Sequence, residues 1–296
     1  MILASQIALK RTQNNERQLE KALQQFFKSL HGEVLDKLDE YWSEYQLLQG
    51  QINLMTKPIT DAEDEYNKIL EKYIRREFKL GTREAERLVQ LTIKRADKGL
   101  LDDLRKTLQI KATRNNLFGT LNEAEQELLT RTFIASKRTL ARITKDINIL
   151  ITEGYTSGKG INVVASVIEK RFNTLETWEA RRIARTEIHN AHNNAVMRTY
   201  DRLGVEYTQW ISVGDGRTRG TDPNDTADHL ILNGEIIPIG ETYSNGLAYP
   251  GDTSGPIEEW INCRCSNAPF VMPAGMMAPP YSPFREEDLI PIKNNE

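Results

Sequence analysis

Two cysteines and a histidine near the C-terminal end of the chain have the side-chain types that hold zinc. Cys263 and Cys265 are separated by one residue, and His229 lies upstream of them. Thiolate sulfur and imidazole nitrogen are ligands that zinc prefers in proteins, usually with four ligands around one ion. This trio therefore needs a fourth ligand, for which the sequence offers Asp215, His189, His192 or another nearby group.

The same cysteines have an interpretation without a metal. A single intervening residue is closer than the usual cysteine spacing of structural zinc sites. On an extended strand the two thiols would face the same side and pack as small apolar groups, with Arg264 on the other side. The pair is too close in sequence to staple a fold, so reduced thiols are expected. We predict that no cofactor is required, with zinc at His229, Cys263 and Cys265 as the alternative.

A set of arginines and carboxylates upstream of the cysteines predicts an ion-pair network. Arg185 and Glu187 lie in one segment, and Asp215, Arg217 and Arg219 follow in a short run. The planar guanidinium of arginine can pair with a carboxylate through two hydrogen bonds. We expect these residues to form a buried network that ties a helix to a sheet. The loss of one partner would then cost about 3–5 kcal/mol of stability.

The segment from Arg181 to Tyr200 is predicted to form one helix that positions part of this network. At a helical period the small residues Ala191 and Ala195 lie toward one side, which would let another element pack closely. His189 and His192 approach the flank of that side. Two interpretations follow: a polar cluster in a cleft, or a helix whose charged residues only make structural ion pairs.

Upstream of this segment the sequence is helical in character. From about residue 5 to 202, apolar residues recur at intervals of three and four, which is typical of amphipathic helices. The clearest apolar stripe consists of Leu19, Leu23, Phe26, Phe27, Leu30, Val34, Leu35, Leu38 and Trp42. A capping-box pattern at Thr60–Glu63 predicts a helix to Gly81, followed by a second helix from Thr82 to Gly99. Further helix is predicted from Asn122 to Gly154.

After Gly204 the sequence changes to short β-prone runs between turn residues. Strands are predicted at 205–213, 230–232, 235–239 and 263–265, and Asn233-Gly234 favours a hairpin turn. Residues 272–283 are rich in proline and are predicted not to continue a sheet. The expected fold class is α+β. It comprises a long helical region to residue 175, a small helix-plus-antiparallel-strand module over 176–271, and an extended Pro-rich tail over 272–296.

Composition excludes several classes of protein. The 296 residues carry 39 Lys and Arg against 42 Asp and Glu, a net charge of −3, which argues against binding that depends on a strongly positive surface. No run of residues is apolar enough to span a membrane, and the N-terminal segment becomes charged too early for a secretory signal. The glycines of 154–160 are spaced too closely for a phosphate-binding loop, so a turn between helices is predicted there.

Several short motifs, taken in order, resemble the phage Mu F-like minor head protein family, also called phage head morphogenesis proteins. The resemblance covers roughly residues 178–271. Between Asp215-x-Arg217-Thr-Arg219 and His229, residues 220–228 form a longer insertion than is usual in the family. The residues that carry the resemblance, as a structural signature, are Arg185, Thr186, Glu187, Trp210, Asp215, Arg217, Arg219, Gly234, Asn262 and Arg264, together with His229, Cys263 and Cys265.

The resemblance implies a low-copy minor capsid protein that acts in head morphogenesis of a tailed bacteriophage. It implies a place in the virion, inside the head at the portal vertex, after synthesis in the bacterial host cytoplasm. The expected partner is the phage portal protein, and scaffold protein, major capsid protein and viral DNA are further candidates. Contacts with the portal are expected from the helical region, and no membrane association is expected.

Two other functions are weighed against this one. A metal-dependent hydrolase or nuclease-type effector carried in the head could use His229, the thiols and nearby acids. The usual signatures of such enzymes are absent, so we predict a protein without catalytic activity. A DNA-binding function would rest on basic residues interleaved with acids, namely Lys94, Arg95, Lys106, Lys111, Arg114, Lys137 and Arg138.

Overall fold

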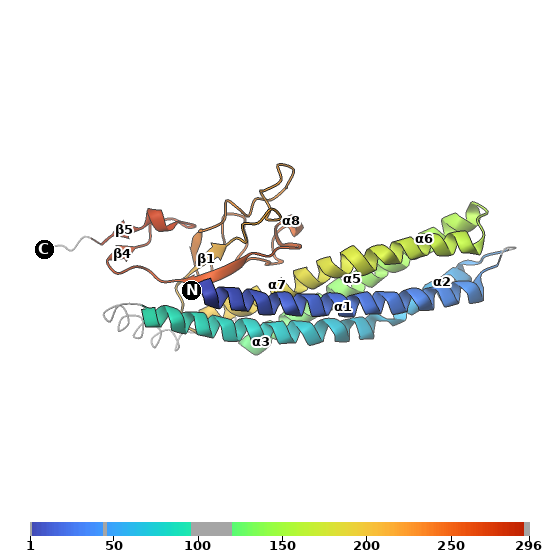
Figure 1. The fold of residues 1–296 in the computed structure, drawn as a ribbon, viewed down its shortest axis with the longest axis horizontal. Helices are drawn as coiled ribbons and strands as arrows, with labels where there is room; N and C mark the ends of the chain where they lie inside the picture. The colour runs from blue at the N-terminus through green and yellow to red at the C-terminus, as the bar shows by residue number, and fades with distance from the viewer. Residues whose placement is uncertain (1, 44–45, 96–119, 293–296) are drawn as a thin grey trace. The chain divides into compact units, whose positions relative to one another are not determined.

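The computed structural model describes residues 2–43, 46–95 and 120–292 (Figure 1). The chain divides into two compact units, each built from segments that are distant in sequence. The helical unit comprises Asn14–Ile74 and Leu128–Ala184. The mixed unit comprises Met1–Gln13, Arg75–Glu127 and Arg185–Glu296. Long helices followed by a small region with antiparallel strands confirm the α+β class, while the divisions predicted at residues 175 and 271 stay a prediction.

Long α-helices form most of the described chain before residue 203 (Figure 1). Their bounds are α1 Ile2–Tyr41, α2 Gln49–Asp61, α3 Glu63–Arg95, α5 Leu121–Thr156, α6 Ile161–Thr174 and α7 Ala180–Arg202, with the short π-helix η1 Leu175–Glu179 before α7. Within the helical unit, most of the predicted stripe on α1 is buried. Leu35 and Trp42 at its C-terminal end stay partly exposed. Phe26 of this stripe stacks on Tyr66 of α3, with ring centroids 5.1 Å apart.

The helix boundaries predicted around Thr60 and Gly81 were wrong. The Thr60 hydroxyl donates to the Lys57 carbonyl at 2.8 Å, so it does not cap α3. Helix α3 also continues through Gly81 to Arg95, and the predicted end at Gly99 lies outside the described residues. A side chain at position 81 would place its Cβ 2.6 Å from the carbonyl oxygen of His192. The glycine therefore permits close packing of α3 on α7 and does not mark a helix end.

The predicted helix from Asn122 exists, but its cap lies two residues earlier. Thr120 and Glu123 form a reciprocal capping box at the start of α5: the Glu123 carboxylate accepts from the Thr120 N–H at 2.7 Å. The Thr120 hydroxyl in turn accepts from the Glu123 N–H. Helix α5 continues past Gly154 to Thr156, and Gly158, at a φ of 65°, lies in the turn before α6. The turn predicted between helices at 154–160 is thus present but shorter, at 157–160.

A buried ion-pair cluster in the helical unit was not predicted from the sequence. The Glu179 side chain is only 5% exposed and pairs with Arg142 of α5 and, at 2.7 Å, with Arg171 of α6. Arg171 also pairs with Asp146 at 3.0 Å. Burial opposes ionisation of Glu179, but the hydrogen bond and charge of Arg142 prevail and lower its pKa. The cluster therefore ties η1 to two helices through one buried carboxylate.

A three-stranded antiparallel sheet lies in the mixed unit. Its strands are β1 Tyr207–Ile211, β2 Ile236–Pro238 and β3 Ser266–Phe270, in the order β2-β1-β3. The strands predicted at 230–232 and 263–265 were wrong, since both segments are irregular or turn structure. Asn233-Gly234 does not join two paired strands as a hairpin. It ends a turn, with a φ of 88° at Gly234, and leads into β2.

The Pro-rich segment folds back onto the mixed unit, contrary to the expectation that it could not continue a sheet. Phe284 is buried and exchanges two backbone hydrogen bonds with Ile236 of β2, at 2.7 and 3.0 Å. Further along, β4 Met276–Met277 pairs with β5 Ile290–Pro291, and a short 3-10 helix, η2 Glu286–Asp288, precedes β5. The apolar contacts of Phe284 with Ile236 and Phe270 explain why this segment is ordered.

None of the helices in the described ranges is both long and apolar enough to cross a membrane.

Candidate functional site

Helix α7 holds the loops of the mixed unit through polar side chains. Asn193 donates to the carbonyls of Pro250 and Cys265, at 2.8 and 2.9 Å, and Asn190 donates to the Gly251 carbonyl. The Thr186 hydroxyl accepts from the N–H of Asn262 at 2.9 Å. Because loops have few backbone partners of their own, these buried amides satisfy carbonyls that would otherwise lack a hydrogen bond.

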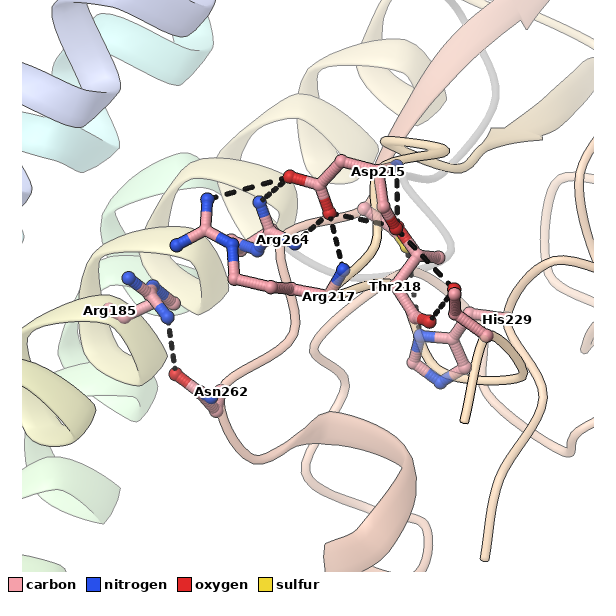
Figure 2. A network of polar contacts seen from close by, with 9 residues as sticks. Arg185, Asp215, Arg217, Thr218, His229, Asn262 and Arg264 are labelled. Atoms are coloured by element: carbon pink, nitrogen blue, oxygen red, sulfur yellow. Dashed lines mark hydrogen bonds and ion pairs between the residues drawn. The ribbon is translucent and has the colours of Figure 1, made fainter. Parts of the chain in front are cut away.

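The carboxylate of Asp215 faces the guanidinium of Arg264 (Figure 2). Arg264 donates two hydrogen bonds to it, at 2.8 and 2.5 Å, in the bidentate form typical of strong pairs. The Arg217 backbone N–H also donates to Asp215, at 3.0 Å. The Arg217 guanidinium is 69% exposed and makes a longer contact of 3.5 Å with the Asp215 carboxylate. The hydrogen bonds from Arg264, followed by the Arg217 N–H, hold the pKa of Asp215 well below its usual range.

The predicted network of buried ion pairs is therefore replaced by a more exposed pair with a different arginine, Arg264. The Asp215 side chain is 38% exposed, so the pair with Arg264 lies at the surface. Arg185 of α7 donates to the Asn262 side-chain oxygen at 3.0 Å (Figure 2). Arg219 donates to the Ile261 carbonyl. The arginines thus reach loop oxygens as well as carboxylates, because a loop held by side chains offers many unpaired carbonyls.

His229, Cys263 and Cys265 come together in the interior of the mixed unit. The Nδ1 atom of His229 lies 3.6 Å from the sulfur of each cysteine. All three side chains are buried, with 1–3% exposure. On the other side of the ring, Nε2 of His229 lies 3.1 Å from the carboxylate of Glu259, a residue of α8 (Ile257–Trp260). Asn245 donates to the same carboxylate oxygen at 2.9 Å.

The two thiols differ strongly in acidity. Their mutual hydrogen bond, together with burial, raises the pKa of Cys263 well above its usual value. The same hydrogen bond lowers the pKa of Cys265 to about 4, with His229 acting in the same direction and burial in the opposite one. The pair therefore holds one sulfur in a readily ionised state, as a metal ligand requires.

His189 and His192, the other candidate ligands on α7, line a separate cavity in the mixed unit with Thr12 and Glu84. His192 contacts the buried carboxylate of Glu77 through Nδ1 at 2.9 Å, and the Thr12 hydroxyl donates to the same oxygen at 2.8 Å. Burial favours the neutral imidazole, but Glu77 prevails and raises the pKa of His192. The structure thus pairs Asp215 with Arg264 and His192 with Glu77.

Two further residues of the predicted signature, Trp210 and Gly234, make packing and backbone contacts next to His229. Trp210 is fully buried and its ring meets His229 and Tyr243 edge-on, with centroids 5.3 and 5.1 Å away. The N–H of Gly234 donates to the Trp210 carbonyl at 2.9 Å. Together they hold the turn that carries His229 against β1.

Several residues of the site were missed by sequence reasoning. Glu259 and Asn245 orient the histidine, Asn193 holds the cysteine loop, and Glu77 binds His192. Glu259 stood directly before Trp-Ile-Asn-Cys and could have been considered for its closeness to the cysteines. Glu77 gave no such signal, because its role depends on contact between two helices that are distant in sequence.

Comparison with known proteins gave one result. A search of curated proteins and a search of solved structures each found no match. A scan of protein families matched residues 145–268 to the model described as phage Mu protein F like protein. The matched range includes α7, β1, β2 and the first part of β3, Asp215 with Arg264, and the cluster of His229 and the cysteines. Over this region the chain is similar to phage Mu protein F-like proteins.

Proposed function

We propose that this chain is a minor head protein of a tailed bacteriophage that binds the portal protein at the DNA-entry vertex. The observation that carries the proposal is the family match over residues 145–268, which indicates a role in phage head morphogenesis. Such a role implies interaction with other head components and a place in the virion. The portal is the partner we favour, with scaffold protein, major capsid protein and viral DNA as other candidates.

The helical unit is the surface we propose for portal contact. Large apolar side chains exposed on its helices are Leu54, Ile134, Ile149, Val163 and Trp178. The Trp178 ring is 58% exposed and lies under the guanidinium of Arg182, at 4.3 Å. Exposed tryptophan and arginine side chains are frequent among the residues that dominate binding energy in protein interfaces. Their presence here supports, in chemical terms, a helical surface that docks on another protein.

Co-purification with the neighbouring portal protein tests the proposal. The full chain would be co-expressed with the portal protein of the same phage, and the complex would be measured at several salt concentrations. We expect a stable complex that Ile134→Glu and Trp178→Ala weaken, while Ile231→Glu, a change at a 62% exposed residue of the mixed unit, leaves it intact. No complex with the portal would contradict the proposal. Loss only with Ile231→Glu would move the contact to the mixed unit.

DNA binding is a weaker proposal for the same head protein. Of the basic residues considered, Lys137 and Arg138 are exposed on α5, whereas the side chains of Lys94, Arg95, Lys106, Lys111 and Arg114 lie outside those described. Retention of the chain on DNA that falls steeply with salt, and falls further in Lys137→Ala/Arg138→Ala, would support DNA contact. Retention that is independent of these changes would contradict it.

The alternative of a metal-dependent hydrolase has less support. An ion that catalyses hydrolysis must keep a position that substrate can reach. His229, Cys263 and Cys265 are 1–3% exposed, which favours a structural role for any ion they bind. The family of head proteins points the same way, and we therefore propose a protein without catalytic activity. Hydrolysis or nuclease activity that a chelator abolishes would contradict this.

A further inference from the structure

The distances among His229, Cys263 and Cys265 match those around a tetrahedral zinc ion. With Zn–N near 2.0 Å and Zn–S near 2.3 Å, tetrahedral geometry separates nitrogen from each sulfur by about 3.5 Å. The structure places Nδ1 at 3.6 Å from both sulfurs, so the histidine is equally distant from the two cysteines. All three ligand atoms lie within 4.8 Å of one another. An ion placed between them would therefore have all three ligand atoms within reach.

Glu259 fixes the tautomer of the histidine that this geometry requires. Because Nε2 of His229 lies 3.1 Å from the Glu259 carboxylate, that nitrogen carries the proton and donates it. The Nδ1 lone pair is then directed at the two sulfurs. Asn245 in turn donates to Glu259 at 2.9 Å and holds it in place. A carboxylate that orients a histidine from behind is a recurring feature of zinc sites, where it raises the basicity of the ligand.

Charge balance also favours an ion. Two buried thiolates would carry two uncompensated negative charges, which is costly in an apolar interior. A zinc ion would neutralise both. Neutral thiols could be buried without a metal, but simple apolar packing gives no reason for a carboxylate and an amide to direct a histidine nitrogen toward both sulfurs.

The surrounding region has little regular structure to hold it together. Between β1 and β3, the only regular elements are β2, with 3 residues, and α8, with 4 residues. His229 lies in one turn of this region, and the cysteines lie in the loop between α8 and β3. Small loop-rich regions commonly depend on a metal or on disulfides, because their apolar core is limited.

We propose that His229, Cys263 and Cys265 bind one zinc ion, with Glu259 as the positioning residue behind the histidine, and that the ion joins the loops of the mixed unit. Asp215 and His192, considered from the sequence as fourth ligands, are held by Arg264 and Glu77. In the part of the chain that the structure describes, the cluster contains three protein ligands. Water or an added small ligand would complete the coordination.

Metal content of the full chain is the first measurement. The protein would be produced in zinc-supplemented medium and freed of loosely bound metal. Its zinc content would then be measured by elemental mass spectrometry. We expect about one zinc per chain, and cobalt loaded in its place should give the absorption bands of tetrahedral thiolate coordination. Bound zinc should also protect both thiols from alkylation until a chelator removes it. This protection is read on the unmodified protein, so it does not depend on whether a variant folds.

Matched variants then assign the ligands. His229→Ala, Cys263→Ser and Cys265→Ser should each lose most of the zinc, whereas His31→Ala, a histidine of the helical unit, should retain it. Glu259→Gln should weaken zinc binding about 10–100-fold, as changes behind a ligand typically do. Its neighbour Glu258, which is exposed, provides the control Glu258→Gln.

Three results would overturn the proposal. They are substantially less than one zinc per chain, thiols that react equally with and without zinc, and a Cys263–Cys265 disulfide in protein isolated under reducing conditions. Portal binding is a separate readout. Zinc binding without a portal complex would leave this site standing and contradict only the proposed function.

Discussion

The helical unit and the mixed unit are stabilised by different kinds of contact. In the helical unit, apolar side chains repeat along each helix and are buried between the helices, together with a few polar groups such as the carboxylate of Glu179. In the mixed unit, short strands and loops depend on side chains that hydrogen-bond to the backbone, such as Asn193, and on paired charges such as Asp215 with Arg264. The buried residues of a helical core thus follow from the spacing of apolar residues along each helix, whereas those of a loop-rich core depend on contacts between distant segments.

The largest expected effect tests the buried carboxylate of the helical unit. Glu179→Gln removes the charge that pairs with Arg142 and Arg171, and should destabilise the protein by about 3 kcal/mol. The measurement is the free energy of unfolding in urea. The exposed Glu169 on α6 provides the control, and Glu169→Gln should stay close to wild type. Equal stabilities would show that the helical unit depends on its apolar core alone.

A pair of glycines gives opposite predictions for the two units. Gly81→Ala, in the mixed unit, should cost about 1–3 kcal/mol, because the added Cβ would meet the His192 carbonyl oxygen and the Ala195 Cβ. Gly32→Ala in α1 should stabilise the helical unit by up to about 1 kcal/mol, since nothing lies within 4 Å of the added group and alanine favours helix. Thermal unfolding of both variants checks the signs. A stabilising Gly81→Ala would contradict the close packing of α3 and α7.

The two arginines around Asp215 differ in burial, so they should differ in effect. Arg264 is 14% exposed and bidentate, and Arg264→Ala should cost about 1–2 kcal/mol. Arg217→Ala should change stability by less than about 0.5 kcal/mol, because that side chain is mostly exposed. Hydrogen exchange of residues 212–219 would locate the loss. If both variants match wild type, the signature motif does not act through this ion pair.

The smallest expected effect is a pH dependence of the mixed unit. The pKa of His192 is raised in the folded state, so protonated His192 stabilises the fold below the ordinary histidine pKa. This stabilisation is lost as the pH rises through the raised value. Urea unfolding between about pH 6 and pH 9 should show the decline, and His192→Gln should flatten it relative to His31→Gln. If the unfolding free energy of His192→Gln declines with pH as steeply as that of wild type, the pH dependence arises from other groups. Glu77 and Glu84 are the carboxylates that face His192.

The part of the fold that could be predicted was the part with a period. The apolar stripe of α1, the long helix after Asn122 and the single helix from Arg181 to Tyr200 follow from residues three and four apart. Helix boundaries were predicted less reliably. Gly81 is a residue type common at helix ends, but here it lies inside α3 and allows α7 to pack closely. Leu230–Leu232 has the composition of a strand but forms a turn, in which the N–H groups of Leu230 and Ile231 donate to the Asp228 carboxylate.

The candidate site was predicted in composition but not in its contacts. The residue types alone identified His229 with the two cysteines, and Asp215 with a set of arginines. Which arginine faces Asp215, and which carboxylate orients His229, could not be predicted. Arg264 and Glu259 reach their partners across 49 and 30 residues of chain. The sequence says little about such separations, because loops carry no periodic signal to fix their path.

Sequence pattern alone was enough to predict the α+β class and the helical character of the first two thirds, and it carries the similarity of residues 145–268 to phage Mu protein F-like proteins. Only the folded structure shows that each unit is built from segments distant in sequence, that the Pro-rich segment packs on β2 through Phe284, and that three candidate ligands meet at one point. The two kinds of feature differ in the sequence separation of the residues that interact. Helices and caps arise from neighbours within one turn, whereas burial, ion pairing and metal geometry depend on segments that only folding brings together.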